Sequence, residues 1–272
     1  MTAGPGFAGR YGPWALVAGA SEGLGAEFGR QLAARGLNVV LAARRAAELE
    51  AVAAEIRAAS PVLVRPLVLD LARPDLAAAV AAATDGLAIG LYVHNAAFAP
   101  MGPFLDRPLA DHERVLAVNC RAPAVLAHAL GRAMRARGRG GIVLMSSLAG
   151  LQGGPLLAHY TATKAYNLVL AEGLWDELRA AGVDVLASCA GATRTPGYLA
   201  TTKVESKLAP VMDPGPVVTA TLAALGRRPS VIPGFGNRVA AFFMQRLLPR
   251  RAAVRLMGAT TRTMYSQRPG EA

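Results

Sequence analysis

Residues 19–25 read Gly19-Ala20-Ser21-Glu22-Gly23-Leu24-Gly25, after a short apolar run at 14–18 and before a stretch of helical period. Glycine at these positions permits a tight turn and lets backbone N–H groups approach a pyrophosphate, which the positive end of the following helix stabilises. The Gly-x3-Gly-x-Gly spacing differs from the common Gly-x-Gly-x-x-Gly pattern, so an ordinary glycine-rich strand–helix turn is the alternative. Its place in the first strand–helix unit favours a dinucleotide site.

Apolar runs of strand length alternate along the chain with Ala-, Leu- and Arg-rich stretches of helical period. This alternation predicts an α/β fold: a single Rossmann-like doubly wound parallel sheet of about seven strands, with helices on both faces and a C-terminal helical extension. We expect strands at 14–18, 38–42, 62–69, 89–93, 141–145, 183–188 and 230–232, and helices at 25–35, 46–59, 74–84, 110–135 and 157–180. Any chemistry is expected in the loops after the strands.

The whole chain, residues 1–272, is expected to form one dinucleotide-binding catalytic domain. The periodic pattern loosens after Gly191, and residues 193–216 are rich in Thr, Pro and Gly. This segment predicts a mobile substrate loop with short helices that closes over a ligand. Helical spacing returns at 236–265, which predicts a helical tail that covers the substrate cleft or a subunit interface.

The composition excludes several classes of protein. With 53% hydrophobic and 17% charged residues, the chain has material for a large core and too little charge for a long unfolded region. The net charge is +11, but neither zinc-finger spacing nor an aromatic-basic strip accompanies it, so no nucleic-acid partner is expected. Two cysteines cannot form a disulfide framework. The four histidines lack paired ligand spacing, so no metal site is predicted; they are His94, His112, His128 and His159.

The beginning of the chain shows no targeting segment. Residues 1–13 lack a basic region followed by an apolar stretch, and no window offers about 18 uninterrupted apolar residues. We therefore expect a cytoplasmic protein, with membrane association at the surface left open.

The residues after the second expected strand indicate which cofactor is used. An NAD site would carry an acid here for the ribose 2′-hydroxyl, but the chain has Ala43, Arg44 and Arg45. A guanidinium group can form charge-assisted, bidentate bonds with a 2′-phosphate. NADP(H) is therefore favoured over NAD(H). The alternative is that both arginines simply lie at the start of a solvent-exposed helix.

A tyrosine and a lysine at i and i+4 lie on one face of the helix expected at 157–180. Tyr160 is a poor base at its ordinary pKa of about 10, but the ammonium of Lys164 is expected to lower that pKa by roughly 1–3 units. Such a tyrosine can exchange a proton with a substrate oxygen. Ser147, at the end of the strand expected at 141–145, would reach the same crevice and hydrogen-bond a carbonyl oxygen, and Ser146 is a competing candidate.

These motifs together resemble the short-chain dehydrogenase/reductase family, in order and over nearly the whole chain. The resemblance implies that Asp70 and Leu71 border the adenine and that Asn95 supports the sheet behind the cofactor. It also implies that Asn119 holds a water in a proton relay and that Lys164 binds the nicotinamide ribose. The implied catalytic residues are Asn119, Ser147, Tyr160 and Lys164. The implied cofactor-binding residues are Gly19, Ser21, Glu22, Gly23, Leu24, Gly25, Arg44, Arg45, Asp70, Leu71, Asn95, Ala96, Ala97, Tyr160, Lys164, Gly191, Thr193 and Thr195, with Thr195 near the nicotinamide carboxamide.

The chain departs from the usual pattern of that family at several positions. Residues 94–97 read His-Asn-Ala-Ala in place of Asn-Asn-Ala-Gly, Ala18 replaces a Thr whose hydroxyl ties two loops, and Ala190 replaces a Pro. Glu22 stands where many NADP-using members have a basic residue. Because the Asn, Ser, Tyr and Lys set is complete, we expect these changes to affect rigidity and cofactor affinity more than chemistry.

The ends of the chain carry a second resemblance. Residues 11–14, 233–238 and 247–251 are similar to a subgroup of long-chain 3-oxoacyl and 17β-hydroxysteroid reductases, which implies bulky lipophilic substrates and a membrane-surface site of action. An interfacial amphipathic helix could be formed by Phe242, Phe243, Leu247 and Leu248 with the adjacent arginines. The alternative is that this face packs on the body of the protein or on a second subunit.

The sequence therefore predicts an NADP(H)-dependent carbonyl reductase or alcohol dehydrogenase that transfers a hydride between nicotinamide C4 and a carbonyl or secondary alcohol. The expected partner is a small lipophilic carbonyl compound: a bulky ketone, a 3-oxoacyl compound or a ketosteroid. Two alternatives stay open, namely a non-catalytic NADP-binding sensor or scaffold and a membrane-surface lipid-binding protein. A homodimer or homotetramer is expected, with peripheral membrane contact through the tail left open.

Overall fold

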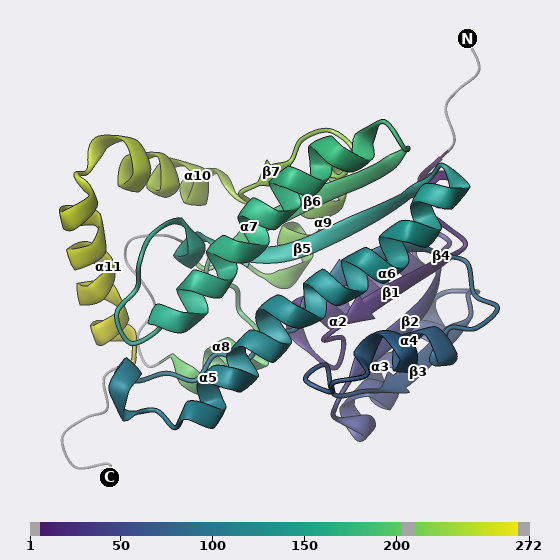
Figure 1. Cartoon of the computed structure of the whole chain (residues 1–272), viewed down its shortest axis with the longest axis horizontal. Helices are drawn as coiled ribbons and strands as arrows, with labels where there is room; N and C mark the ends of the chain where they lie inside the picture. Colours follow the sequence, from purple (N-terminus) through teal and green to yellow (C-terminus); the bar gives the residue numbers. More distant parts are fainter. Residues whose placement is uncertain (1–5, 203–209, 266–272) are drawn as a thin grey trace.

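A parallel sheet of seven strands forms the centre of the protein, as a computed structural model describes it for residues 6–202 and 210–265 (Figure 1). The strand order is β3-β2-β1-β4-β5-β6-β7, so the direction of winding reverses between β1 and β4. In a doubly wound sheet the ligand crevice opens at this reversal, beyond the carboxyl ends of the strands. The predicted fold class is confirmed.

The elements lie close to where the sequence predicted them. The strands are β1 (Trp14–Ala18), β2 (Asn38–Ala43), β3 (Val64–Val68), β4 (Ile89–His94), β5 (Gly140–Ser147), β6 (Val183–Ala190) and β7 (Ser230–Val231). The helices before β5 are α1 (Phe7–Tyr11), α2 (Gly23–Ala33), α3 (Ala46–Ala59), α4 (Leu76–Ala83), the 3₁₀ turn η1 (Phe104–Asp106), α5 (Leu109–Leu116), the π turn η2 (Ala117–Arg121) and α6 (Ala122–Arg137). Those after β5 are the 3₁₀ turn η3 (Leu148–Leu151), α7 (Ala158–Arg179), α8 (Pro196–Thr201), α9 (Pro214–Ala224), α10 (Phe235–Phe242), the π turn η4 (Phe243–Leu247) and α11 (Arg250–Tyr265).

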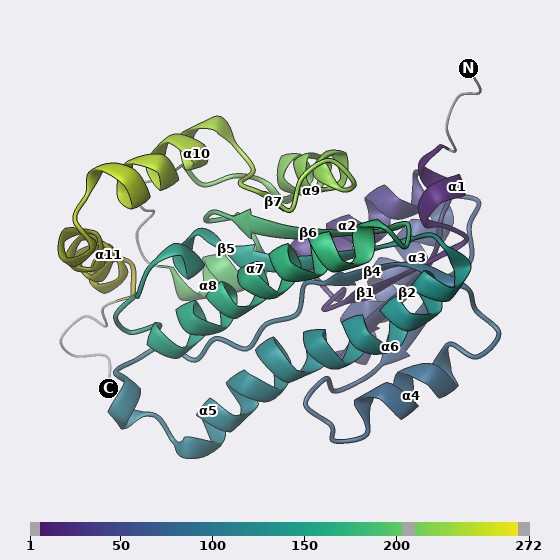
Figure 2. The ribbon, with the colours of Figure 1, turned by 45° about the horizontal axis from the view of Figure 1, so that its top comes forward.

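Two apolar cores, one on each face of the sheet, hold the layers together. Alternate residues of the strands point to opposite faces, so Leu16 and Val17 of β1 lie in different cores. Helices α2, α3 and α9 cover one face, and α4, α6 and α7 cover the other (Figure 2). Strands β4 and β6 are buried along their whole length, as expected for central strands of a parallel sheet.

The helix predicted over 110–135 is divided by a π turn. Pro123 lacks an N–H, so it cannot donate to the carbonyl oxygen of Asn119 four residues earlier. That oxygen accepts a hydrogen bond from Nδ2 of Asn167 on α7 instead, at 3.1 Å. A wider turn at residues 117–121 is the result, and it places the Asn119 side chain inside the protein.

The segment predicted as a substrate loop, 193–216, is shorter at its end than expected. Thr195 begins α8 by accepting a hydrogen bond from the Tyr198 N–H at 3.2 Å, and Thr193 forms a β-bridge with Met212. Helix α9 starts at Pro214, because proline suits the first position of a helix, so the predicted boundary at 216 is wrong by two residues. Residues 203–209 of the predicted loop lie outside the described residues.

His94, which replaces a family asparagine, is a fully buried residue at the end of β4. Its Nδ1 lies 2.7 Å from the Tyr92 hydroxyl, while Nε2 has no hydrogen-bond partner among the described residues. Burial, with a smaller contribution from the Lys164 ammonium, lowers the pKa of His94 to about 3. The folded protein therefore holds His94 neutral.

We expect this histidine to make the protein sensitive to acid. In the unfolded chain His94 takes up a proton near pH 6.5, whereas the folded state resists protonation down to about pH 3. The contribution of neutral His94 to the free energy of unfolding is therefore fully present above pH 6.5. Below that pH, the free energy of unfolding falls by up to about 1.4 kcal/mol for each pH unit. Urea unfolding between about pH 7.5 and about pH 4.5 measures this slope.

Replacing the titrating group tests the assignment. His94→Asn is expected to flatten the pH dependence, because asparagine does not titrate, while His128→Asn, at an exposed position on α6, leaves it unchanged. Equal slopes for the wild type and His94→Asn would contradict the prediction.

Candidate active site

Two adjoining cavities open at the carboxyl ends of the strands. The larger has a volume of about 670 Å³ and the smaller of about 410 Å³. They meet at a shared wall made of Leu24, Asn95, Ala97, Leu157, Tyr160, Thr195, Tyr198 and Tyr265. A ligand in the larger cavity therefore lies directly beside a second ligand in the smaller one.

The glycine turn forms one side of the larger cavity, and its residues face the loops after β3 and β4. Gly23 has φ of +55°, and a Cβ there would lie 2.9 Å from the Thr195 methyl. Both the backbone conformation and the lack of space therefore favour glycine at this position. Gly25 lets α2 approach β1, since a Cβ there would lie 1.9 Å from the Gly19 carbonyl oxygen. The predicted residues that line this cavity are Gly19, Ser21, Glu22, Gly23, Leu24, Arg44, Arg45, Asp70, Leu71, Asn95, Ala96, Ala97, Tyr160 and Thr195.

The loops that meet at this cavity are tied together without the family threonine. The main-chain oxygen of Ala18 accepts from the N–H groups of Asn95 at 3.0 Å and Ala96 at 2.9 Å. Nδ2 of Asn95 in turn donates to the Gly19 oxygen at 3.0 Å. Backbone and amide bonds therefore tie these two loops together in this chain.

Two arginines at the end of β2 border the larger cavity. Arg45 forms an ion pair with Glu22 at 2.6 Å and donates to the Ser21 hydroxyl at 3.1 Å. Arg44 is exposed and forms no ion pair or hydrogen bond with any described residue. The negative charge of Glu22 is thus matched by Arg45, and the Arg44 guanidinium is available to an anionic ligand.

Asp70 lies on the opposite side of the larger cavity. Its carboxylate accepts from the Ala72 N–H at 3.0 Å and from Arg114 at 2.8 Å. Burial disfavours the charged form, but these two contacts, with a smaller contribution from the charge of Arg44, outweigh it and hold the pKa of Asp70 below its ordinary value. Asp70 is therefore a fixed acceptor at neutral pH.

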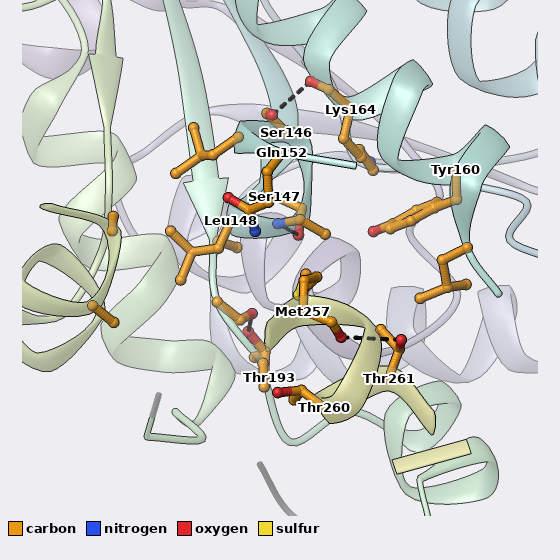
Figure 3. Close-up of a pocket in the computed structure, with 18 of the residues that line it drawn as sticks. Ser146, Ser147, Leu148, Gln152, Tyr160, Lys164, Thr193, Met257, Thr260 and Thr261 are labelled. Atoms are coloured by element: carbon orange, nitrogen blue, oxygen red, sulfur yellow. Dashed lines mark hydrogen bonds between the residues drawn. The ribbon is translucent and has the colours of Figure 1, made fainter. Parts of the chain in front are cut away.

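Ser147, Tyr160 and Lys164 come together in the smaller cavity (Figure 3). Ser147 Oγ accepts from the Ala149 N–H at 3.1 Å, and its hydroxyl also interacts with the Tyr160 side chain. Ser146 Oγ donates instead to the Lys164 main-chain oxygen at 2.7 Å. Of the two serines that the sequence left open, Ser147 is therefore the one whose hydroxyl interacts with Tyr160.

The expected effect of Lys164 on Tyr160 is wrong. Burial raises the pKa of Tyr160 to about 12, and a hydrogen bond with Ser147 offsets only part of this rise. The Lys164 ammonium lies 5.5 Å from the centre of the Tyr160 ring and donates to the Met145 main-chain oxygen at 2.8 Å. Burial also lowers the pKa of Lys164 to about 8. The phenol therefore keeps its proton at neutral pH.

Six predicted site residues do not line the larger cavity. Gly25 lines neither cavity, and Ser147 and Lys164 line only the smaller one. Asn119 is buried behind the site, where its amide bonds the backbone of Phe98 at 2.8 and 2.9 Å and the Thr163 hydroxyl at 3.1 Å. Gly191 and Thr193 line the smaller cavity only. Their part in cofactor binding, and the part of Asn119 in a proton relay, remain predictions.

The sequence did not identify most of the residues that complete the smaller cavity. The tail covers it, as one of the two alternatives for residues 236–265 predicted, and methionines are prominent in its wall. Apolar spacing revealed a helix here, but only the folded chain shows which face points inward. The lining residues that the sequence did not name individually include Gln152, Tyr198, Met244, Leu256, Met257, Thr260, Thr261, Met264 and Tyr265.

The described residues contain neither a metal-binding cluster nor a membrane-spanning helix. Within residues 6–202 and 210–265, no three His, Cys, Asp or Glu side chains lie close enough to hold a metal ion. None of the helices in the same part of the chain is both long and apolar enough to cross a bilayer.

Comparison with known proteins identifies relatives of the chain. Over 233 residues it is 33% identical to 7beta-hydroxysteroid dehydrogenase of Collinsella aerofaciens, which spans 84% of this chain and 89% of the relative. Over 267 residues it is 30% identical to very-long-chain 3-oxoacyl-CoA reductase of Phaeosphaeria nodorum, spanning 90% of this chain and 75% of the relative.

Solved structures agree with the sequence relatives. A 7beta-hydroxysteroid dehydrogenase structure superimposes with a TM-score of 0.87 and 30% identity, covering 93% of this chain and 99% of the other. A short-chain dehydrogenase from Sphingobium yanoikuyae in complex with NADPH gives a TM-score of 0.73 and 35% identity, covering 81% of this chain and 87% of the other. Residues 13–205 match the short chain dehydrogenase family itself. This match, with the glycine turn and the Ser, Tyr and Lys set in one crevice, shows that the chain belongs to the short chain dehydrogenase family and is an oxidoreductase.

Proposed function

We propose that this protein is an NADP(H)-dependent carbonyl reductase or alcohol dehydrogenase for bulky lipophilic ketones, with a ketosteroid as the first candidate substrate. The observation that carries the proposal is the smaller cavity of about 410 Å³. Ser147 and Tyr160 lie at one part of its wall, and apolar side chains of the tail form another. A non-catalytic sensor would need the larger cavity for its ligand, but it would not need a second cavity that contains Ser147 and Tyr160.

The larger cavity fits a phosphorylated dinucleotide. The N-terminus of α2 and the glycine turn offer backbone N–H groups and a positive helix end to a pyrophosphate. Arg44, with no ion-pair partner among the described residues, suits a 2′-phosphate, and Asp70 and Leu71 border the far side. When bound, the cofactor supplies or accepts a hydride at nicotinamide C4. The NADPH complex of the Sphingobium relative supports the same choice.

The protonation states of the site allow proton donation to a ketone oxygen. Tyr160, with a pKa raised to about 12 by burial, is a neutral phenol at pH 7 and can donate its proton as the oxygen gains charge. The Ser147 hydroxyl donates a hydrogen bond to the same oxygen. Lys164, buried beside Tyr160, is proposed to hold the nicotinamide ribose and to stabilise the phenolate that remains.

The choice of a ketosteroid rests on the tail and the relatives. The 7beta-hydroxysteroid dehydrogenase structure covers 93% of this chain. The matched part must therefore include some of residues 235–265. A bulky-bulky ketone specific alcohol dehydrogenase from Comamonas testosteroni, 30% identical with a TM-score of 0.73, supports a large ketone more generally. The relatives that reduce 3-oxoacyl-CoA make a long-chain 3-oxoacyl thioester the second candidate.

A homodimer or homotetramer in the cytoplasm completes the proposal. Leu109, Leu116, Tyr166 and Val169 are large apolar side chains on α5 and α7 that are 41–72% exposed. Exposed apolar groups on neighbouring helices are typical of a subunit contact.

A substrate panel with NADPH tests the proposed function. We expect kcat/KM for a ketosteroid to exceed that for cyclohexanone at least tenfold, since two additional buried methylene groups already contribute about 1.6 kcal/mol. The initial rate of NADPH oxidation is the readout, with a 3-oxoacyl thioester as the third substrate. Higher kcat/KM for the thioester would favour the second candidate, and no oxidation with any ketone would refute the proposal.

Tyr160→Phe is expected to bind NADPH normally but to lose at least about 10² in turnover, because the ring stays and only the proton donor is removed. Cofactor fluorescence measures binding and single-turnover kinetics measure the chemical step. Tyr166→Phe, at an exposed position on the same helix, is the matched control. Turnover like that of the wild type would rule Tyr160 out as the proton donor.

Exchanging the residues at the end of β2 tests the cofactor preference. Ala43→Asp combined with Arg44→Leu is expected to weaken NADPH binding about tenfold or more and to improve NADH binding. The acid repels a 2′-phosphate and accepts from a 2′-hydroxyl. Dissociation constants from fluorescence titration provide the comparison, with Arg57→Leu on the exposed side of α3 as the control. Tighter binding of NADH than of NADPH by the native protein would show the assignment to be wrong.

A further inference from the structure

The outer face of α10 and η4 exposes a row of large apolar side chains. They recur at helical spacing along one side and are 51–74% exposed, although the protein has two apolar cores. We call this row the tail face; it consists of Phe235, Val239, Phe242 and Leu247, whereas Phe243 lines the smaller cavity. A contiguous apolar surface of this kind marks a contact with another molecule or with a membrane.

The same segment is strongly basic. Residues 235–265 contain six arginines and no Lys, Asp or Glu, so they hold six of the eleven net positive charges of the chain. Arg246 is exposed between Phe243 and Leu247, and the Arg238 guanidinium lies 5.8 Å from the centre of the Phe235 ring. Aromatic and aliphatic groups are therefore mixed with cations on one surface.

The opposite side of these helices lines the smaller cavity. Ala240 and Met244 face inward from α10 and η4, and Leu256 and Met257 of α11 continue the same wall. Figure 2 shows α10 and α11 at the end of the molecule opposite α1, with no other labelled element on their outer side. The tail is thus a wall that is a single helix layer thick between the cavity and whatever contacts the tail face.

We propose that the tail face docks on an anionic phospholipid surface. Phe242 and Leu247 insert among the acyl chains at the interface, while the arginines contact lipid phosphates, as in an interfacial amphipathic helix. A symmetric contact between two copies of this face would bring the exposed Arg238 and Arg246 of one copy near those of the other, which opposes self-association. An anionic surface neutralises that charge.

Vesicle sedimentation of the full-length protein tests this docking without substrate or cofactor. The protein is expected to pellet with phosphatidylcholine vesicles that contain about 30 mol% phosphatidylglycerol and to stay largely in solution with phosphatidylcholine alone. About 0.5 M NaCl should release a large part of the bound protein, because salt screens the arginines. A catalytic failure would leave this result unchanged, so the two proposals are tested separately.

Two variants outside both cavities test which groups carry the binding. Phe242→Ser combined with Leu247→Ser, and separately Arg246→Glu, are expected to lower partitioning onto anionic vesicles at least about tenfold. Leu63→Ser combined with Val68→Ser is the matched control, because both residues are 59–65% exposed and lie at the β3 edge of the sheet. Melting temperature and turnover of a water-soluble ketone should stay unchanged in all three proteins.

Several outcomes would overturn the proposal. One is wild-type protein that stays in solution with both kinds of vesicle, which would leave the tail face to a protein partner such as an acidic carrier. Another is equal loss of vesicle binding in the β3-edge control. A third is a change in oligomeric state of the tail-face variants, measured by sedimentation velocity without lipid, which would identify the face as a contact between subunits.

Discussion

The close approach of Gly25 to the Gly19 carbonyl fixes the geometry on which the rest of the site depends. No side chain fits between them, so α2 packs directly against the end of β1 and directs its N-terminus at the larger cavity. The Asn95 amide bonds the same Gly19 oxygen and joins the turn to the loop after β4. One crowded point thus sets the positions of the helix dipole, the glycine turn and the wall that both cavities share.

Burial, more than the charge of a neighbour, sets the protonation states around the site. The pKa of Tyr160 rises to about 12 and that of Lys164 falls to about 8, because both groups lose solvent that would stabilise their charged forms. His94 responds in the same way, with a pKa lowered to about 3.

The tail has two faces with different roles in the proposed function. Its inner face supplies methionines to the smaller cavity, and these flexible, polarisable side chains can adapt to a large apolar ligand. Its outer face carries Phe242 and Leu247 among arginines. A lipophilic substrate and the surface on which such a substrate concentrates would therefore meet on opposite sides of the same helices.

The sequence by itself determined the fold class, the glycine turn and the pairing of Tyr160 with Lys164, because these depend on local periodicity and on spacing along the chain. Tertiary structure decided what depends on burial and on contacts between distant segments. Ser147 rather than Ser146 interacts with Tyr160 because Ser146 bonds α7, and the pKa of Tyr160 is raised because the fold removes it from water. The sequence also could not predict which face of the tail points inward. A helical repeat gives the spacing of apolar groups but not the direction in which the helix packs.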